Sequence, residues 1–409
     1  MNEPDSSGPF SFVNRQPFVD ADTGLALEDG RVFLGRGFGA RVMTDGEVVF
    51  NTSMVGYQEI ATDPSYRGQM VVLTHPQIGN YGVQDEARES KRPWLTALIV
   101  RDLAAHPNHW LSSSTMDRYL DGAGVPGIQG IDTRALTKHL RTHGTMRAAL
   151  GPVEGGAGLA SQIERLIAAA RNAIPLSAKN LVAEVSNVES SRRPTDRQIE
   201  SVTSGSRARV ALVDCGVKHN IARSLVARGA DLTVLPWNAT FDDVLAAGVD
   251  GVVVSNGPGD PERMNQVEAL VHDLLRRAIP TLGICLGHQV MGLSAGGATS
   301  RLKFGHHGGN HPVRDLTTGR VHITSQNHEF QVDSDSITEA SGFFVSMVNL
   351  NDGSVEGLAH RELPAFSVQY HPEGCPGPQD NQYVFERFLS MAAQPTSGAT
   401  ALRGVLSAE

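Results

Sequence analysis

The chain has 409 residues, enough for two or three domains with buried cores. Its 35 Lys and Arg residues are outnumbered by 44 Asp and Glu residues, which argues against binding of nucleic acid through bulk positive charge. No apolar stretch approaches the ~20 residues of a membrane helix, and the acidic, polar start is unlike a signal peptide. We therefore expect a cytoplasmic protein without a nucleic-acid or membrane partner.

The three cysteines, Cys215, Cys285 and Cys375, lie far apart and form no Cys-x-x-Cys motif. An odd count without that motif suggests neither a disulfide framework nor a zinc knuckle. We expect reduced thiols, and a buried, inert side chain is the default interpretation of each.

In chain order, residues 1–25 are rich in Pro, Ser, Asp and Gly and are expected to form a flexible arm. A mixed α/β domain is predicted over residues 26–185, because short β-like runs there precede helical patterns. The predicted strands are 31–34, 46–50, 69–73 and 95–100, and the predicted helices are 133–141, with Asp132 as N-cap and Gly144 as its end, and 158–173.

Residues 186–208 are polar and rich in turn formers, so we interpret them as a linker. A second domain is predicted over 209–393, followed by a tail at 394–409. Strands at 210–213, 231–235, 251–254 and 281–284 alternate there with helices at 220–227, 241–247, 262–278 and 287–293. This pattern predicts a doubly wound, mostly parallel sheet with helices on both faces. Ligands of such folds bind beyond the carboxyl ends of the strands.

Cys285 stands where the last of these strands passes into a helix, within Gly283-Ile-Cys-Leu-Gly287. This Gly-x-nucleophile-x-Gly form is that of a nucleophile elbow, a tight turn that exposes the reactive side chain. The helix N-terminus favours negative charge on the sulfur. The Leu286 amide is placed as an oxyanion donor. Alone, the motif is weak evidence, because glycines near a buried Cys are common.

Two further segments follow strand-like runs. In Gln369-Tyr-His-Pro-Glu373, extended backbone places His371 and Glu373 on one face, where a carboxylate orients an imidazole. A turn with a solvated carboxylate is the alternative. The rigid loop 255–261, with Gly257 and Gly259, fits an oxyanion hole or a purely structural turn. Together the segments supply a nucleophile, a base, an orienting carboxylate and oxyanion donors for one crevice.

These residues carry a resemblance to the class I, triad-type glutamine amidotransferases. Within that class the chain resembles the small, glutaminase subunits of carbamoyl-phosphate synthetases, from about residue 25 to about 391. The specific segments are 50–59, 62–66, 303–313 and 325–328. The resemblance implies a heterodimer, or a higher oligomer, with a large subunit that uses ATP, Mg and bicarbonate. It implies roles in arginine and pyrimidine biosynthesis, and no cofactor or metal in this chain.

By position, the resemblance implies that Cys285 attacks glutamine to form a γ-glutamyl thioester, with His371 as acid and base and Glu373 as its orienter. The implied glutamine-binding residues are Ser65, Gly257, Gly259, Leu286, Gln289, Asn327, Glu329 and Phe330. Ammonia would pass through an internal route to the large subunit.

The sequence departs from this family at two positions. Family members often have Gly where this chain has Glu329, so its side chain either alters glutamine affinity or points outward. Cys375 stands where a small residue such as Ser is usual, and without an elbow around it we interpret it as a bystander.

Three other interpretations of the sequence are a metal site, a different amidotransferase and a non-catalytic subunit. His306, His307, His311 and His322 match no common zinc spacing and are interpreted as buried, hydrogen-bonding residues of a Gly-rich loop. The glutaminase part of an anthranilate or guanylate synthetase would share the triad but not the segment 51–58. A non-catalytic binding subunit would not need an intact Cys, His and Glu set.

Overall fold

The computed structural model describes residues 11–12, 21–187, 191–192 and 208–394, and the chain divides into two compact units. The first unit comprises residues 1–179 and 303–307, and the second comprises 180–302 and 308–409. Residues 395–409 of the expected tail, most of the expected linker and residues 1–10 and 13–20 of the expected arm lie outside the described residues.

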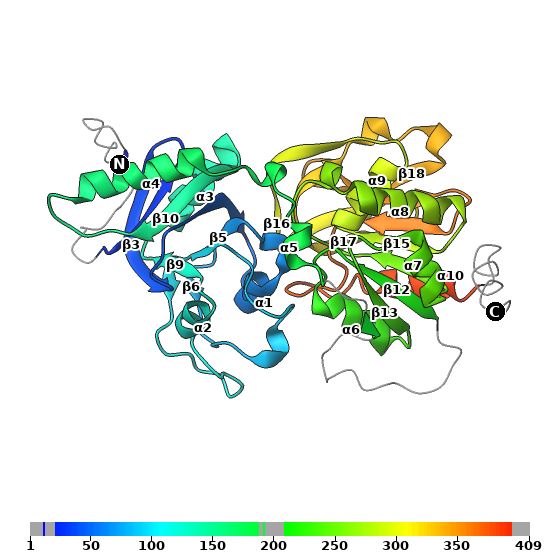
Figure 1. Ribbon diagram of the computed structural model, residues 1–409, viewed down its shortest axis with the longest axis horizontal. Coiled ribbons are helices and arrows are strands. Elements are labelled where there is room, and N and C mark those ends of the chain that lie inside the picture. The colour runs from blue at the N-terminus through cyan, green and yellow to red at the C-terminus, as the bar shows by residue number, and fades with distance from the viewer. Residues whose placement is uncertain (1–10, 13–20, 188–190, 193–207, 395–409) are drawn as a thin grey trace. The chain divides into compact units, whose positions relative to one another are not determined.

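The sheet of the first unit closes on itself (Figure 1). Its strand order is β1-β3-β2-β10-β4-β5-β7-β9, and β9 also pairs with β3, so that only β1 stays outside the ring. The pairs β4–β5, β5–β7 and β7–β9 are parallel, whereas those among β9, β3, β2, β10 and β4 are antiparallel. The strands are β1 (Ser11–Phe12), β2 (Thr23–Leu27), β3 (Arg31–Gly39), β4 (Thr44–Asn51), β5 (Gln69–Leu73), β7 (Ala97–Ile99), β9 (Pro126–Gln129) and β10 (Met146–Pro152).

Alternation along these strands gives the first unit separate apolar layers. Leu25 and Leu27 pack in a cluster with α3, whereas Ala26 between them packs with α4. The helices are α1 (Tyr57–Thr62), α2 (Met116–Gly122), α3 (Thr133–His143) and α4 (Leu159–Asn172), and a small sheet joins β6 (Gln77–Ile78) to β8 (Asp102–Leu103). As predicted, the Asp132 side chain caps α3 and Gly144 ends it.

The second unit is built on a ten-stranded sheet of order β11-β13-β12-β14-β15-β20-β19-β18-β16-β17. The neighbours from β13 to β20 pair in parallel, as the sequence predicts. The order reverses at β12, whose neighbours on its two sides are β13 and β14, so the switch point of the sheet lies there. The strands are β11 (Ser191–Arg192), β12 (Arg209–Asp214), β13 (Asp231–Pro236), β14 (Gly251–Val254), β15 (Thr281–Ile284), β16 (Thr299–Asp315), β17 (Val321–Val332), β18 (Phe343–Asn349), β19 (Val355–His360) and β20 (Ala365–Val368).

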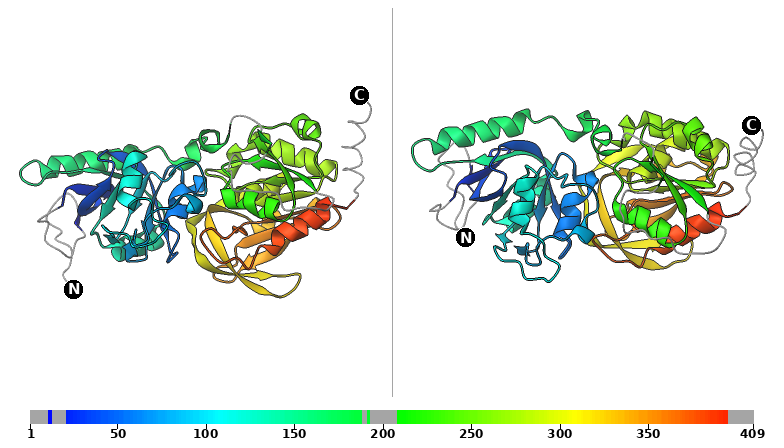
Figure 2. Two further views of the ribbon diagram at one scale, coloured as in Figure 1. Left: turned by 90° about the horizontal axis from the view of Figure 1, so that it is seen from below. Right: turned by 60° about the horizontal axis from the view of Figure 1, so that its bottom comes forward.

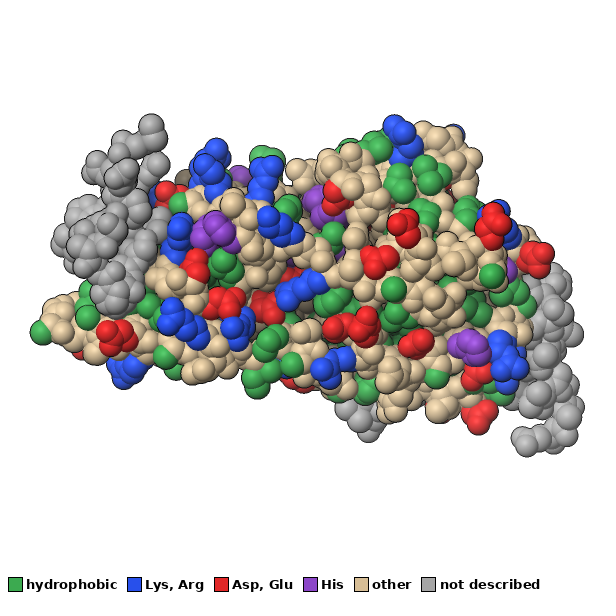
Figure 3. Space-filling view, turned by 90° about the horizontal axis from the view of Figure 1, so that it is seen from above, with side chains coloured by type: hydrophobic (Ala, Val, Ile, Leu, Met, Phe, Trp, Pro, Cys, Tyr) green, Lys and Arg blue, Asp and Glu red, His purple; other side chains and the backbone are tan. Residues whose placement is uncertain are grey.

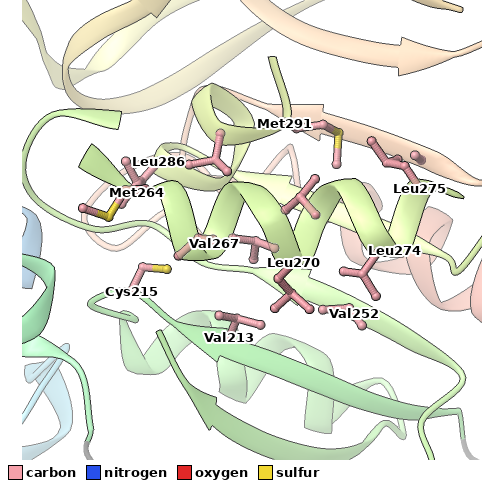
Figure 4. Close-up of a cluster of buried hydrophobic side chains, with 14 of the residues drawn as sticks. Val213, Cys215, Val252, Met264, Val267, Leu270, Leu274, Leu275, Leu286 and Met291 are labelled. Carbon is pink, nitrogen blue, oxygen red and sulfur yellow. The ribbon is translucent and has the colours of Figure 1, made fainter. Parts of the chain in front are cut away.

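Helices cover both faces of this parallel part (Figures 1 and 2). One apolar layer contains α7, α8 and α9, and the other contains α6 and α10. Val267, Leu270 and Leu274 of α8 lie toward Val213 and Val252 of the sheet (Figure 4). With Val271 and Leu275 they form the buried, helically spaced positions of α8. The helices are α5 (Val182–Val185), α6 (His219–Ala227), α7 (Phe241–Ala247), α8 (Asn265–Arg276), α9 (Leu286–Ser294) and α10 (Tyr383–Ala392).

The structure differs from the sequence predictions at several places, among them strands β1 in the expected arm and β11 in the expected linker. β2 begins at Thr23, so residues 23–25 are a fully buried strand and not part of an arm. α5 belongs to the second unit, because Val182 packs in its core, and the first unit therefore ends at 179 and not at 185. His306, His307 and His311 lie in β16 and His322 lies in β17, so they do not form a Gly-rich loop.

The second unit should depend on the apolar face of α8. Leu270→Ala should lower its stability by about 2–5 kcal/mol, because the buried side chain leaves a cavity. Urea-dependent hydrogen exchange of peptides from residues 209–300 measures this loss. His272→Ala, at an exposed position of the same helix, is the control, and equal stability of both variants would contradict the packing described here.

Candidate active site

Cys285 occupies a strained turn between β15 and α9. Its φ of 54° and ψ of −102° lie in a region that side chains rarely adopt. Such strain persists only where the surroundings fix the backbone, and it is concentrated at functional sites. Cys285 is the N-cap of α9 and is 2% exposed, and its thiol donates a hydrogen bond to the carbonyl of Asn327 at 3.5 Å.

The flanking glycines are required by close backbone contacts. A Cβ on Gly283 would lie 2.4 Å from the carbonyl oxygen of Gly287, and a Cβ on Gly287 would lie 2.2 Å from that of Val254. No side chain fits at either position, which confirms the elbow that the sequence predicts.

His371, Glu373 and Lys218 form a buried charged chain. The Nδ1 atom of His371 donates to Oε1 of Glu373 at 2.6 Å, and the Nζ atom of Lys218 lies 2.9 Å from the same oxygen. All three residues are at most 2% exposed. The alternative of a solvated carboxylate is therefore wrong. His371 and Glu373 are on a turn after β20 and not in extended backbone, but their side chains meet as predicted.

This arrangement sets the protonation of the pair. Burial has the largest single effect and disfavours the charged imidazole, but the carboxylate of Glu373 together with Cys285 outweighs burial and the opposing charge of Lys218 and raises the pKa of His371 to about 10. Burial likewise opposes the charge of Glu373, yet Lys218 and His371 hold its pKa well below the usual range. The site therefore holds an imidazolium at neutral pH.

Other predicted residues surround the thiol. Gln289 on α9 donates from Nε2 to the carbonyl of Phe330 at 2.8 Å and to Oε1 of Gln369 at 3.2 Å. Asn327 and Phe330 lie on β17, so backbone carbonyls of this strand contact both Cys285 and Gln289. The structure thus brings Cys285, Gln289, Asn327 and Phe330 together.

The loop after β14 reaches the elbow through Gly257. A Cβ there would lie 2.2 Å from the carbonyl oxygen of Cys215 and 2.9 Å from the side chain of Leu286. The Leu286 side chain packs in the core, which leaves its backbone as the group available for chemistry. Gly259 has a φ of 96°, which a glycine adopts without strain.

Glu329 does not point outward. It is 8% exposed, and its Oε2 atom lies 2.8 Å from the Arg301 guanidinium on the neighbouring strand β16. The outward-pointing alternative is therefore wrong, while its contact with glutamine stays a prediction. Ser65 lies in the first unit, in a 3-10 turn (Pro64–Tyr66), where its amide donates to Asp63. Its role also stays a prediction.

The other cysteines differ from Cys285 in their surroundings. Burial, with a smaller contribution from Asp214, raises the pKa of the Cys215 thiol, which keeps it protonated and inert. Cys375 is partly exposed and is not in a strand-to-helix turn.

Sequence reasoning missed Lys218 and Asn220. Both follow β12, and the Asn220 side chain donates to the backbone carbonyl of Glu373 at 2.7 Å. Their signal was their position after the carboxyl end of a predicted strand, the place where such folds bind ligands. That signal alone does not single them out, because neither residue belongs to a recognisable spacing.

Among the described residues, neither a surface of one charge on the face shown in Figure 3 nor a membrane-spanning helix is seen. On the face shown in Figure 3, basic and acidic side chains are mixed with uncharged ones. Within the described part of the chain, every helix is too short or too polar to cross a membrane.

Comparisons with known proteins agree with this geometry. Residues 211–391 match the family model of the class-I glutamine amidotransferases, and residues 25–150 match that of the carbamoyl-phosphate synthase small chain, CPSase domain. The carbamoyl phosphate synthase small chain of Symbiobacterium thermophilum is 47% identical, with 89% of this chain and 97% of the relative covered. That of Methanopyrus kandleri is 45% identical, with 90% and 99% covered.

Among solved structures, the chain is similar to a putative GMP synthase subunit from Thermoplasma acidophilum. The TM-score is 0.41 and the identity 20%, with 50% of this chain and 100% of the other covered.

The second unit thus carries the domain of a class I glutamine amidotransferase, and the protein is an enzyme subunit that hydrolyses glutamine. The whole chain belongs to the carbamoyl-phosphate synthase small chain family.

The elbow should not tolerate a methyl group. Gly287→Ala should lower the melting temperature and slow glutamate release from glutamine by about 10-fold or more, because the backbone that holds Cys285 must shift. Gly155→Ala is the control, since a Cβ there meets nothing within 4 Å. If Gly287→Ala matched that control in both measurements, the tight turn would not be needed.

The charge of His371 should be visible by NMR. With selectively labelled histidines, the His371 signal, assigned from its loss in His371→Asn, should not titrate near about 6.5, the usual pKa of histidine. In Glu373→Gln the pKa of His371 should fall, because burial and Lys218 then both oppose the imidazolium. A signal that titrates near neutral pH in the unaltered protein would contradict the charged pair.

Proposed function

We propose that the chain is the glutamine-hydrolysing small subunit of a carbamoyl-phosphate synthetase, with Cys285, His371 and Glu373 as its catalytic triad. The observation that carries this proposal is the buried contact of His371 with the carboxylate of Glu373, which Lys218 also contacts and which favours the imidazolium form. An imidazolium beside a cysteine at a helix N-terminus is the arrangement that keeps a thiolate ready to attack.

The first half of the reaction forms a thioester. The Cys285 thiolate attacks the side-chain amide carbon of glutamine, and the electron pair of the carbonyl moves to its oxygen, which the Leu286 amide N–H stabilises. His371 gives its proton to the amide nitrogen, the C–N bond breaks, and ammonia leaves behind a γ-glutamyl thioester.

The second half regenerates the enzyme. Neutral His371 takes a proton from a water molecule as that water attacks the thioester carbon. The C–S bond breaks, glutamate leaves, and the thiolate and imidazolium are restored. Glu373 holds the imidazole in one orientation and stabilises its charge in both halves.

Glutamine is held by residues from several elements. Ser65, Gly257, Gly259, Gln289, Asn327, Glu329 and Phe330 are the proposed ligands. The carbonyls of Asn327 and Phe330 already contact Cys285 and Gln289, which supports a binding site along β17.

Ammonia then passes to the large partner that is expected for a small chain of a two-subunit synthase. ATP, Mg and bicarbonate bind there, and this chain carries no cofactor of its own. A closed route preserves reactivity, because ammonia released into neutral water is protonated and loses its nucleophilicity. We place the reaction in the cytoplasm, where free thiols such as Cys285 stay reduced. Its product would serve arginine and pyrimidine biosynthesis, and a relative from Halalkalibacterium halodurans is named a pyrimidine-specific small chain.

Glutamate release from glutamine, with and without an ATP-binding large subunit, tests this function. We expect slow hydrolysis by the isolated chain and faster hydrolysis with the partner and ATP. Cys285→Ser and His371→Asn should abolish glutamine-dependent synthesis of carbamoyl phosphate while sparing synthesis from added ammonia. Folded protein without hydrolysis under both conditions would favour a non-catalytic binding subunit.

A further inference from the structure

Three consecutive residues of β17 join the nucleophile, the base and a second buried carboxylate. The carbonyl of Ser325 accepts a hydrogen bond from the His371 amide at 2.8 Å, and the carbonyl of Asn327 accepts one from the Cys285 thiol at 3.5 Å. Carbonyls two residues apart in a strand point to the same edge, so these two contacts are on one edge of β17. The segment 325–327 therefore sets how Cys285 and His371 lie relative to each other.

The residue between them is held by Glu356 of β19. The Gln326 side chain donates from Nε2 to Oε2 of Glu356 at 2.8 Å, and Asn349 donates from Nδ2 to Oε1 at 2.7 Å. Glu356 is fully buried. Its backbone carbonyl accepts from the amide of Gln369 at 2.9 Å, two residues before His371.

We propose that Glu356 is a positioning residue for glutamine hydrolysis. It fixes the segment 325–327 through Gln326, and thereby fixes the separation of the Cys285 sulfur and the His371 imidazole. It touches neither of these reacting groups, and the inference rests on the proposed function.

A carboxylate suits this position because Gln326 and Asn349 both donate to it from side-chain amides, and ring nitrogens of the buried His306 and His328 also lie within 4.8 Å of a carboxylate oxygen. A carboxylate offers two acceptor oxygens and no donor. A glutamine would turn its own NH2 group toward one of the two amides and would leave a buried pair of donors facing each other. Gln326 would lose its hydrogen bond to residue 356 and keep the one to Oγ1 of Thr324 at 3.0 Å, although the volume of the side chain at 356 is unchanged.

The experiment exchanges the hydrogen-bond acceptor at position 356 and the donor at position 326. Glu356→Gln should lower kcat for glutamine hydrolysis by about 10-fold and leave KM within about twofold, since Gln289 still holds Phe330. The double variant Glu356→Gln with Gln326→Glu should restore kcat to within about threefold, because the new glutamate accepts from the new glutamine. Gln326→Glu alone would place its new carboxylate against that of Glu356. It should lower kcat more than Glu356→Gln or the double variant. The control is Glu362→Gln, the same change at an exposed position.

Alkylation of Cys285 by iodoacetamide, with Cys285→Ala as the blank, reports the same geometry without glutamine. Its rate should fall in Glu356→Gln and recover in the double variant. If the unaltered protein releases no glutamate, the proposed function fails, while the alkylation rates still decide the role of Glu356. A folded Glu356→Gln with unchanged kcat and alkylation would overturn the proposal. A double variant that regains the melting temperature but not the rates, or two variants that both fail to fold, would also overturn it.

Discussion

The candidate active site depends on the negative charge of Glu373, which is fully buried. An isolated carboxylate in such a place would take up a proton, so its charge requires cations beside it. Lys218 follows β12 and His371 follows β20, and both contact the same oxygen of Glu373. The charged chain therefore forms only when strands that are distant in the sequence are assembled in one sheet. Buried ion pairs of this kind are poor sources of stability, and the effect of this one that can be stated is the raised pKa of His371.

Two separate features act on Cys285. The first is the elbow, which places Cys285 at the start of α9 with a positive φ. The backbone is packed so closely there that only glycine fits at positions 283 and 287. The second is the imidazolium of His371. The elbow is fixed by close backbone packing, whereas the imidazolium is favoured by the contacting carboxylate of Glu373. Each can therefore be altered without the other. Gly287→Ala disturbs the first and Glu373→Gln disturbs the second.

The sequence predicted the features that are local. The predicted bounds of β5, β14, β15 and α7 are correct, because the spacing of apolar residues and the turn residues that end each element lie within one short segment. Cys285 and the His371–Glu373 pair were found for the same reason. Lys218 could not be identified, because its partner Glu373 follows a different strand, far away in the sequence. A single lysine also forms no motif with its sequence neighbours. The antiparallel strands β16 to β19 were not predicted, since Gly and His residues in β16 obscure its alternation.

Glu373 and Glu356 are both fully buried but have different surroundings, and the difference separates their roles. Glu373 contacts an imidazole and an ammonium group, so replacing it changes the charge and the pKa of His371. Glu356 accepts hydrogen bonds from two side-chain amides, whose donors and acceptors can be exchanged between partners. A swap at Glu356 and Gln326 keeps the net charge of that pair and changes only which side chain carries it. Protonation and geometry at the catalytic site can therefore be tested independently, the first through Glu373 and the second through Glu356.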